Sequence, residues 1–389
     1  MPSTPPAATA KVLTARAKPK TIDIQAQLTF AAQARGVSPF RIAADVVRRR
    51  IGPQRLSAQD YFLLGLYRPE LSEADRAAFV SEYEISRLNA KLQPTLEHAV
   101  YGLMNSKLLS AVLLRGMGLP CATTVAVARA TPAQLPCEVL VGPEAVEQFL
   151  RAEGRFPLFG KPDGSSLGVG AASFLNRDGD MLRLGDGTRV PVRRLAQEIA
   201  RDYPAGYLFQ TLLRPHPDLA RLIGPIVGTL RVLSLRFAGG PTPLYAMLKL
   251  PGPGAMVDGA LSGSNAAAII DLETGQIRRA QLLSEPIGKD LMHSHVTGAE
   301  LPGAVLPDFA KAVELALDAH RLFPHLGVLG SDVILTDTGP ILNELNPNPL
   351  AGLVQKAMGQ GLLNEAFKAK YREALALNGV KLPIKGVRI

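Results

Sequence analysis

Two acidic residues and an amide late in the chain have the spacing of a metal-binding β-hairpin. The segment SDVILTDTGPILNELN, residues 331–346, places two β-forming runs on either side of an Asp-Thr-Gly turn. A turn centred on Thr338 would set Asp332 opposite Glu344, with Asn346 on the same side as Glu344. The other pairs expected in this register are Thr336 with Pro340 and Ile334 with Leu342.

Like charges opposite one another on a strand ladder repel, and aliphatic neighbours on both faces would keep screening water away from Asp332 and Glu344. A bound cation would remove this conflict. Carboxylate and carbonyl oxygens are hard ligands that suit Mg²⁺ or Mn²⁺, which commonly share phosphate oxygens. The alternative is a hairpin at a sheet edge with both acids solvated.

A glycine-rich segment, residues 155–175, could hold the phosphates that accompany such a metal. Lys161 ends an apolar strand and is followed by DGSSLGVG, whose glycines let backbone N–H groups approach an anion. The segment is not a Walker A loop, because Pro162 occupies the Ser/Thr position and the glycine spacing is wrong. A tight turn without any ligand explains the glycines equally well.

Helices and strands must alternate to position these groups. Helical spacing runs from Asp23 to about His98, with Ser57 and Ser72 as suitable N-caps. After a helix in SKLLSAVLLRGMG, strands are expected in TTVAVA, CEVLVG, YLFQTLL, GTLRVLSLRF, TPLYAMLKL and NAAAIIDLETG. A helix in PDFAKAVELALDAHRLF precedes the hairpin, and another, at about 361–377, follows it.

The composition is that of a globular protein, with 389 residues, 47% hydrophobic and 20% charged. No apolar run approaches the roughly 18 residues needed to cross a bilayer, and Cys121 and Cys137 lack metal-ligand spacing. We therefore expect a cytoplasmic protein with reduced thiols.

Most of the net charge of +9 lies in the N-terminal part of the chain. Through Arg55 there are ten Lys and Arg against Asp23 and Asp45, a charge of +8. A solvated helix face, a contact with nucleic acid or anionic lipid, and a transit peptide are all possible interpretations. Nucleic acid is disfavoured because this region has few aromatic residues to stack on bases and no recognisable nucleic-acid-binding motif.

These blocks, in this order, resemble the ATP-grasp superfamily, and more narrowly the sugar-transfer-associated ATP-grasp proteins related to α-L-glutamate ligases. The resemblance covers about residues 40–350. It is carried by RRRIGPQRLSAQDYFLLGLYRPELS, LNAKL, NSKLLSAVLLRGMGLP, LFGKPDGSSLGVG, FQTLLRPHPDLARL, GTLRVLSL, VDGALSGSNAAAIIDLETG, HVTGAELPG, LPDF and GSDVILTDTGPILNELN.

The resemblance implies a role for each matching residue. Lys107 and Lys161 correspond to lysines that reach the nucleotide phosphates, and Gln210 lies at the hinge between the subdomains. Arg231 and Lys249 would face the triphosphate as catalytic cations. The flap over the nucleotide would be Gly164, Ser165, Ser166, Leu167 and Gly168, and the metal ligands Asp332, Glu344 and Asn346. An ordinary solvated helix position remains the alternative for Lys107.

Some positions depart from the family pattern. Ser331 stands where the family usually has an aromatic residue, Leu345 where it has a glycine, and Gly259 where it has an asparagine. These changes are compatible with the expected nucleotide site, but they leave undetermined which acceptor the protein would use. Two further features remain open as well: Asp258 and Asn265 could shape an acceptor pocket, and His293 and His295 could be metal ligands or ordinary loop hydrogen-bonders.

The implied fold is α+β, an ATP-grasp fold of two α+β subdomains that clamp a nucleotide, behind a helical N-terminal extension. The expected segments are a disordered tail (1–20), a helical region (21–104), a small subdomain with the flap (105–212) and a C-terminal subdomain with the metal hairpin (213–389).

The implied function is a ligase that uses ATP and Mg²⁺ (or Mn²⁺) to join a small-molecule carboxylate to an amine through an acyl-phosphate. One alternative is phosphoryl transfer to a hydroxyl or sugar. Another is a nucleotide-binding accessory protein of polysaccharide or natural-product assembly.

Overall fold

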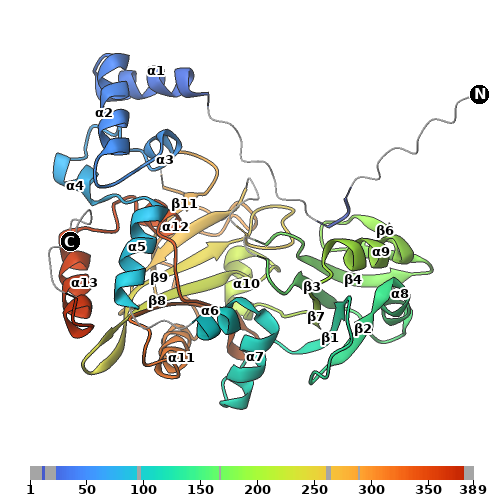
Figure 1. The fold of residues 1–389 in the computed structure, drawn as a ribbon. Coiled ribbons are helices and arrows are strands. Elements are labelled where there is room, and N and C mark those ends of the chain that lie inside the picture. Colours follow the sequence, from blue (N-terminus) through green and yellow to red (C-terminus); the bar gives the residue numbers. More distant parts are fainter. Residues whose placement is uncertain are drawn as a thin grey trace, which may run out of the picture.

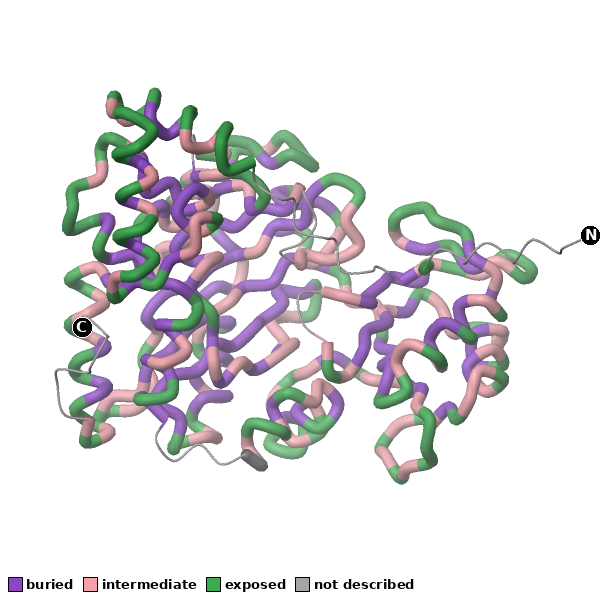
Figure 2. Tube along the Cα trace, turned by 45° about the horizontal axis from the view of Figure 1, so that its top comes forward, coloured by how far each residue is buried: buried purple, intermediate pink, exposed green. Residues whose placement is uncertain are grey.

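The computed structural model describes residues 11–13, 23–93, 98–165, 168–259, 264–287 and 290–380. In these ranges helices and strands are mixed, and the strands form two separate sheets (Figure 1). The α+β class expected from the sequence is therefore confirmed. Buried residues concentrate in the sheets and the helices that cover them, whereas the N-terminal helices carry much of the exposed surface (Figure 2).

Within the described residues, seven helices precede the first strand, and α7 is treated below; the other six come first. They are α1 (Ile24–Arg35), α2 (Pro39–Ile51), α3 (Ala58–Leu63), α4 (Glu73–Ala78), α5 (Glu82–Leu92) and α6 (His98–Asn105). Ser57 and Ser72 each cap a helix and form a capping box with Asp60 and Asp75, which confirms both predicted N-caps. Helices α1, α2 and α3 close over a small core that contains Tyr61 and Phe62 and also includes Ile287, which follows the second sheet's strand β11 (Ile277–Leu282) in the chain.

The first sheet has seven strands, in the order β2-β1-β7-β3-β4-β5-β6. The strands are β1 (Thr124–Arg129), β2 (Glu138–Val141), β3 (Leu158–Pro162), β4 (Ala172–Asp178), β5 (Met181–Leu184), β6 (Arg189–Pro191) and β7 (Tyr207–Thr211). Helices α8 (Gly142–Arg151) and α9 (Val192–Asp202) pack on it through buried aliphatic and aromatic side chains. All pairings are antiparallel except that of β1 with β2.

The second sheet has six antiparallel strands, in the order β11-β10-β9-β8-β12-β13. The strands are β8 (Thr229–Phe237), β9 (Gly240–Leu250), β10 (Ala266–Ile270), β11 (Ile277–Leu282), β12 (Val328–Thr336) and β13 (Gly339–Asn346). Helix α10 (Pro217–Ile223) connects the two sheets, and α11 (Phe309–Arg321), α12 (Gly352–Met358) and α13 (Glu365–Leu377) pack on the second.

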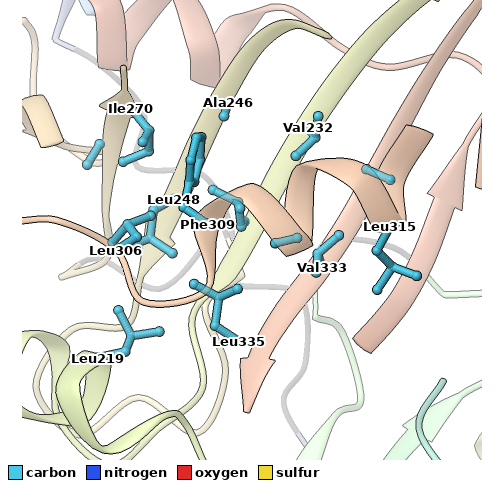
Figure 3. Close-up of a cluster of buried hydrophobic side chains, with 14 of the residues drawn as sticks. Leu219, Val232, Ala246, Leu248, Ile270, Leu306, Phe309, Leu315, Val333 and Leu335 are labelled. Carbon is cyan, nitrogen blue, oxygen red and sulfur yellow. The ribbon is translucent and has the colours of Figure 1, made fainter. Parts of the chain in front are cut away.

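The two faces of the second sheet have separate cores. On one face, Phe309 and Leu315 of α11 meet aliphatic side chains of the sheet such as Val232 and Val333 (Figure 3). Side chains of α5, α12 and α13, Tyr371 among them, cover the other. The sheet is thus buried on both sides and forms a rigid platform.

Helix α7 (Lys107–Gly116) lies between the two sheets. It contacts β13 of the second sheet, while its Leu108 packs with Val127 and Leu208 of the first. Among the described residues, no helix is both long and apolar enough to cross a lipid bilayer.

The predicted domain boundaries stay predictions. Residues 1–10 and 14–20 of the expected disordered tail lie outside the described residues. Between them, the backbone N–H groups of Val12 and Leu13 donate to the Glu198 carboxylate, and Leu13 is buried.

The hairpin of β12 and β13 differs in register from the expectation. Its turn is shorter, so that Thr336 pairs with Gly339 and Ile334 with Ile341, and the predicted Thr336–Pro340 and Ile334–Leu342 pairs are wrong. A β-bulge at Asn343 then shifts the register by one residue, and Asp332 pairs with Glu344 as predicted.

Candidate functional site

The predicted metal ligands and two predicted cations share one face of the second sheet. Asp332 lies between Glu344 on β13 and Arg231 on β8. Directly paired residues project to the same side, and so do residues two apart, which adds Asn346 and Lys249 to this face. The pairing of β8, β9, β12 and β13 therefore gathers residues that are more than 100 positions apart in sequence.

Asp332 is buried and is bonded to both cations. Its Oδ1 accepts from Arg231 Nε at 2.5 Å, and its Oδ2 accepts from Arg231 Nη2 at 2.7 Å and from Lys249 Nζ at 3.0 Å. Burial disfavours the charged carboxylate, but the charges of Arg231 and Lys249 outweigh it and hold the pKa of Asp332 well below its usual range. Gly330 makes room for this arrangement, because a Cβ there would lie 2.9 Å from Pro349 Cβ and 3.5 Å from Arg231 Cδ.

Two more lysines reach this cluster from the side of the first sheet. Lys107 Nζ, at the start of α7, lies 4.0 Å from Glu344 Oε1, and Lys161 Nζ, on β3, donates to Asn343 Oδ1 at 2.9 Å. Burial, together with the nearby charge of Lys107, lowers the pKa of Lys161 to about 8. Four cationic side chains and three carboxylates, those of Asp163, Asp332 and Glu344, thus gather where the sheets meet. The excess of positive charge suits a polyphosphate.

The flap predicted after Lys161 is described only in part. Ser166 and Leu167 lie outside the described residues, while Gly164, Ser165 and Gly168 are placed. Lys107 Nζ donates to the backbone oxygens of Asp163 at 3.2 Å and Ser165 at 2.5 Å, which ties the start of the turn to α7.

The far end of the flap meets a loop of the second sheet. Gly168 has a φ of +76°, and a Cβ there would lie 3.0 Å from a methyl group of Val257. The described parts of this loop, residues 251–259 and 264–265, are joined by Asn265, whose Oδ1 accepts from Gly252 N at 2.7 Å and whose Nδ2 donates to Gly259 O at 2.7 Å. Asp258 fixes it to β8 by accepting from Thr229 N at 2.7 Å. These contacts give Asp258 and Asn265 structural partners; a role in acceptor binding stays a prediction.

Gln210 lies on β7, close to the point where the chain leaves the first sheet. It is buried and donates to Thr124 Oγ1 at 3.1 Å. Its pairing with Phe159, two residues before Lys161, puts it on the same face of the sheet as that lysine. Its placement is consistent with a nucleotide contact, which stays a prediction.

The oxygen donors on this face are chemically suited to Mg²⁺. Glu344 is partly exposed. Asn346 Nδ2 donates to Gly330 O at 3.4 Å, so this hydrogen bond uses the amide nitrogen and leaves the amide oxygen of Asn346 for a ligand. Each carboxylate oxygen has two lone pairs, so Asp332 Oδ1, which accepts from Arg231 Nε, retains a second acceptor position. Glu344, Asn346 and Asp332 therefore fit a divalent cation.

Other candidate ligands do not gather into a metal site. Within the described ranges, no three His, Cys, Asp or Glu side chains come together, and His293 instead pairs with Glu300 in a short β-bridge. Of the positions that depart from the family pattern, Ser331 and Leu345 are both buried, on the face of the sheet away from the carboxylates.

Two residues of the cluster were missed by the sequence analysis. Asn343 contacts Lys161 because the bulge reorients it, and a bulge has no distinct signal in NELN. Asp163 caps α7 by accepting from Leu108 N at 2.9 Å and from Ser106 Oγ at 2.8 Å. An aspartate directly after Lys-Pro in the glycine-rich turn was the available signal for it.

Residues 195–370 match the sequence model of a family described as sugar-transfer associated ATP-grasp. No curated protein matches the chain.

Solved structures match at low identity. They include a D-alanine–D-alanine ligase from Helicobacter pylori (14% identity, 70% of this chain and 61% of that one, TM-score 0.39) and the VanG D-Ala:D-Ser ligase from Enterococcus faecalis (13%, 71% and 62%, 0.40). An L-amino acid ligase from Bacillus licheniformis also matches (13%, 63% and 41%, 0.32). The chain spans less than two thirds of the length of each of these proteins.

Proposed function

We propose that the chain is a member of the sugar-transfer-associated ATP-grasp family, whose sequence model matches residues 195–370, and that it is an ATP-dependent ligase joining a carboxylate to an amine. The observation that carries the proposal is the meeting of Lys107, Lys161, Arg231 and Lys249 around the paired carboxylates Asp332 and Glu344. Such a cluster can bind a triphosphate and offset charge that develops during phosphoryl transfer.

In the proposed reaction, an oxygen of the substrate carboxylate attacks the γ-phosphorus of ATP, and the bond to the β-phosphate oxygen breaks to release ADP. The nitrogen of the amine then attacks the carbonyl carbon of the acyl-phosphate. Phosphate leaves, the nitrogen loses a proton, and an amide remains.

The protein's part in this reaction is mainly electrostatic. Lys161 on the first sheet and Lys107 on α7 would hold the phosphates, while Arg231 and Lys249, both bonded to Asp332, would face the transferring group. Mg²⁺ bound by Glu344, Asn346 and Asp332 would supply further neutralisation of the phosphate oxygens.

Phosphate release tests the proposal directly. Purified protein is incubated with ATP and Mg²⁺ and with pairs drawn from amino acids, peptides and sugar acids, and products are identified by mass. We expect phosphate release that requires both an acid and an amine. The mass of the product should equal the summed masses of the acid and the amine minus one water. ATP consumption with a hydroxyl compound alone, giving a phosphorylated product, would establish the phosphotransferase alternative instead.

Removing the partly exposed carboxylate should abolish turnover. In Glu344→Ala, the metal and the nearby cations lose their principal exposed acidic partner, and we expect ATP turnover to fall by about 100-fold or more. The matched control is Glu314→Ala, a solvent-exposed glutamate on α11, which should retain the parent rate. Turnover within a few-fold of the parent in Glu344→Ala would contradict the assignment of the metal ligands.

A further inference from the structure

Helix α2 carries a row of apolar side chains on its solvent face. Successive residues of an α-helix are rotated by about 100°, so Phe40, Ala44, Val47 and Ile51 lie along one side of α2. Phe40 is 87% exposed, Val47 56% and Ile51 80%, and Ala44 is also exposed. We call these four residues the apolar row.

The opposite side of α2 is the one that holds the helix to the protein. Ile42, Asp45 and Arg49 are buried there, and Asp45 accepts hydrogen bonds from Arg35, Arg48 and Tyr61. Because this face is already packed, the apolar row is not needed for folding. Figure 1 shows α1 and α2 at the edge of the molecule, away from the first sheet.

Arginines flank the apolar row on both sides. The same helical geometry places Arg41 and Arg48 along one side of the row and Arg50 along the other. Arg48 pairs with Asp45 and Glu73, whereas Arg41 and Arg50 are exposed and have no ion-pair partner within the described part of the chain. Between residues 23 and 55 six arginines stand against Asp23 and Asp45, a net charge of +4, so this part of the chain is positively charged.

We propose that this face of α2 is a docking surface for an anionic lipid bilayer. An apolar row between basic side chains is the pattern of a helix lying in a membrane interface, because the aliphatic and aromatic groups enter the acyl region while arginines reach the phosphates. A stable protein interface needs roughly 800 Å² from each partner, which four side chains on one helix of about 20 Å do not supply.

The docking surface is independent of the proposed ligase reaction. It lies on the N-terminal helices, and none of its residues contacts the lysine and carboxylate cluster. Its role would be to bring the nucleotide site to a membrane, where a lipid-linked substrate or product would be within reach. The outcome of the vesicle-binding test therefore does not depend on the outcome of the phosphate-release test.

Co-sedimentation with vesicles tests the proposal on the full chain. We expect the protein to pellet with vesicles made of equal parts phosphatidylcholine and phosphatidylglycerol and to stay in solution with phosphatidylcholine alone. Replacing the row (Phe40→Ser, Val47→Ser and Ile51→Ser together) should lower the apparent affinity by roughly tenfold or more. Arg41→Gln with Arg50→Gln should have a similar effect, and added salt should weaken parent binding.

Matched controls remove equivalent groups elsewhere on the surface. Val141→Ser, Val305→Ser and Leu377→Ser together remove exposed apolar groups, and Arg193→Gln with Arg372→Gln removes two exposed arginines. Both controls should bind vesicles like the parent. The proposal is overturned if the parent does not pellet with anionic vesicles, or if loss of the row leaves binding unchanged. Loss of a concentration-dependent dimer in the row variant, without any vesicle binding, would assign the face to a second copy of the chain.

Discussion

At the scale of single residues, Asp332 shows how burial and charge oppose each other. Burial alone would favour a neutral carboxyl group, yet Arg231 and Lys249 keep it ionised, and in turn it holds the two cations side by side. The Asp332 side chain is 3% exposed and those of Arg231 and Lys249 are 14% and 13% exposed, so water would only partly replace a lost partner. The local electrostatics therefore tie stability to the same residues that would bind phosphate.

This coupling predicts a large stability loss for Asp332→Asn. The substitution leaves two buried cations without their counter-charge, and we expect the free energy of unfolding to fall by about 3 kcal/mol. Urea denaturation measures the change. Asp178→Asn breaks an exposed pair with Arg189 and should cost at most about 1 kcal/mol. Equal losses in the two variants would contradict the view that enclosure sets the cost.

Lys161 predicts how nucleotide binding depends on pH. Its pKa of about 8 lies below the ordinary lysine value of 10.5, so the side chain loses its charge as the pH rises past about 8. ATP affinity should then fall by up to about tenfold per pH unit above that point. Calorimetric titrations between pH 7 and pH 9 measure the slope.

Lys161→Arg is the control for this titration, because an arginine stays protonated throughout this range. Its affinity should be nearly independent of pH; a slope like that of the parent would show that another group titrates. The same shift acts on stability with the opposite sign. The folded state binds fewer protons at Lys161 between about pH 8 and 10.5, so this residue makes stability rise with pH there.

At the scale of elements, the pairing of α11 with the second sheet depends on a buried histidine. His320 Nδ1 lies 2.7 Å from Ser234 Oγ on β8, and its Nε2 lies 2.9 Å from the backbone oxygen of Leu326. The neutral ring can satisfy both bonds by donating from Nε2 and accepting at Nδ1. Burial disfavours the protonated ring and lowers the pKa of His320 to about 4.

Acid should therefore weaken this contact. The unfolded chain takes up a proton near pH 6.5, whereas folded His320 resists it down to about pH 4, so stability is complete above pH 6.5 and falls between these values. The loss by pH 4 should be about 3 kcal/mol relative to a variant that cannot titrate, His320→Gln. Urea denaturation of both proteins at pH 7 and pH 4 measures the difference; parallel losses in the two would contradict the prediction.

At the scale of the whole molecule, the candidate site depends on two sheets meeting. Lys161 comes from the first sheet, Arg231, Lys249, Asp332 and Glu344 from the second, and Lys107 from the helix between them. A ligand bound here would contact both halves of the fold. Its binding energy should thus stabilise the molecule as a unit.

A non-hydrolysable ATP analogue with Mg²⁺ tests this expectation. At 100 times its dissociation constant it should add about 2.7 kcal/mol to the free energy of unfolding, measured by urea denaturation. Adenosine at the same concentration lacks the phosphates and should add much less. A gain with adenosine as large as that with the analogue would show that the lysine cluster is not the nucleotide site.

Local sequence patterns predicted much of this fold. The α+β class, the N-caps Ser57 and Ser72 and the pairing of Asp332 with Glu344 are confirmed, because caps and strand alternation depend on neighbouring residues. The grouping of Lys107, Lys161, Arg231 and Lys249 was inferred from a family resemblance. Their roles stay predictions, although the structure brings their side chains into one cluster.

Tertiary structure alone decided the details of the cluster. The bulge at Asn343 set which side chain meets Lys161, and the order of β8, β9 and β12 set Asp332 between two cations. Those contacts join residues far apart in the chain, where spacing carries no information about distance. Residue type and periodicity therefore determined which groups this protein has available, and the packing of the two sheets determined how their charges are paired, because electrostatic energy depends on separation and burial.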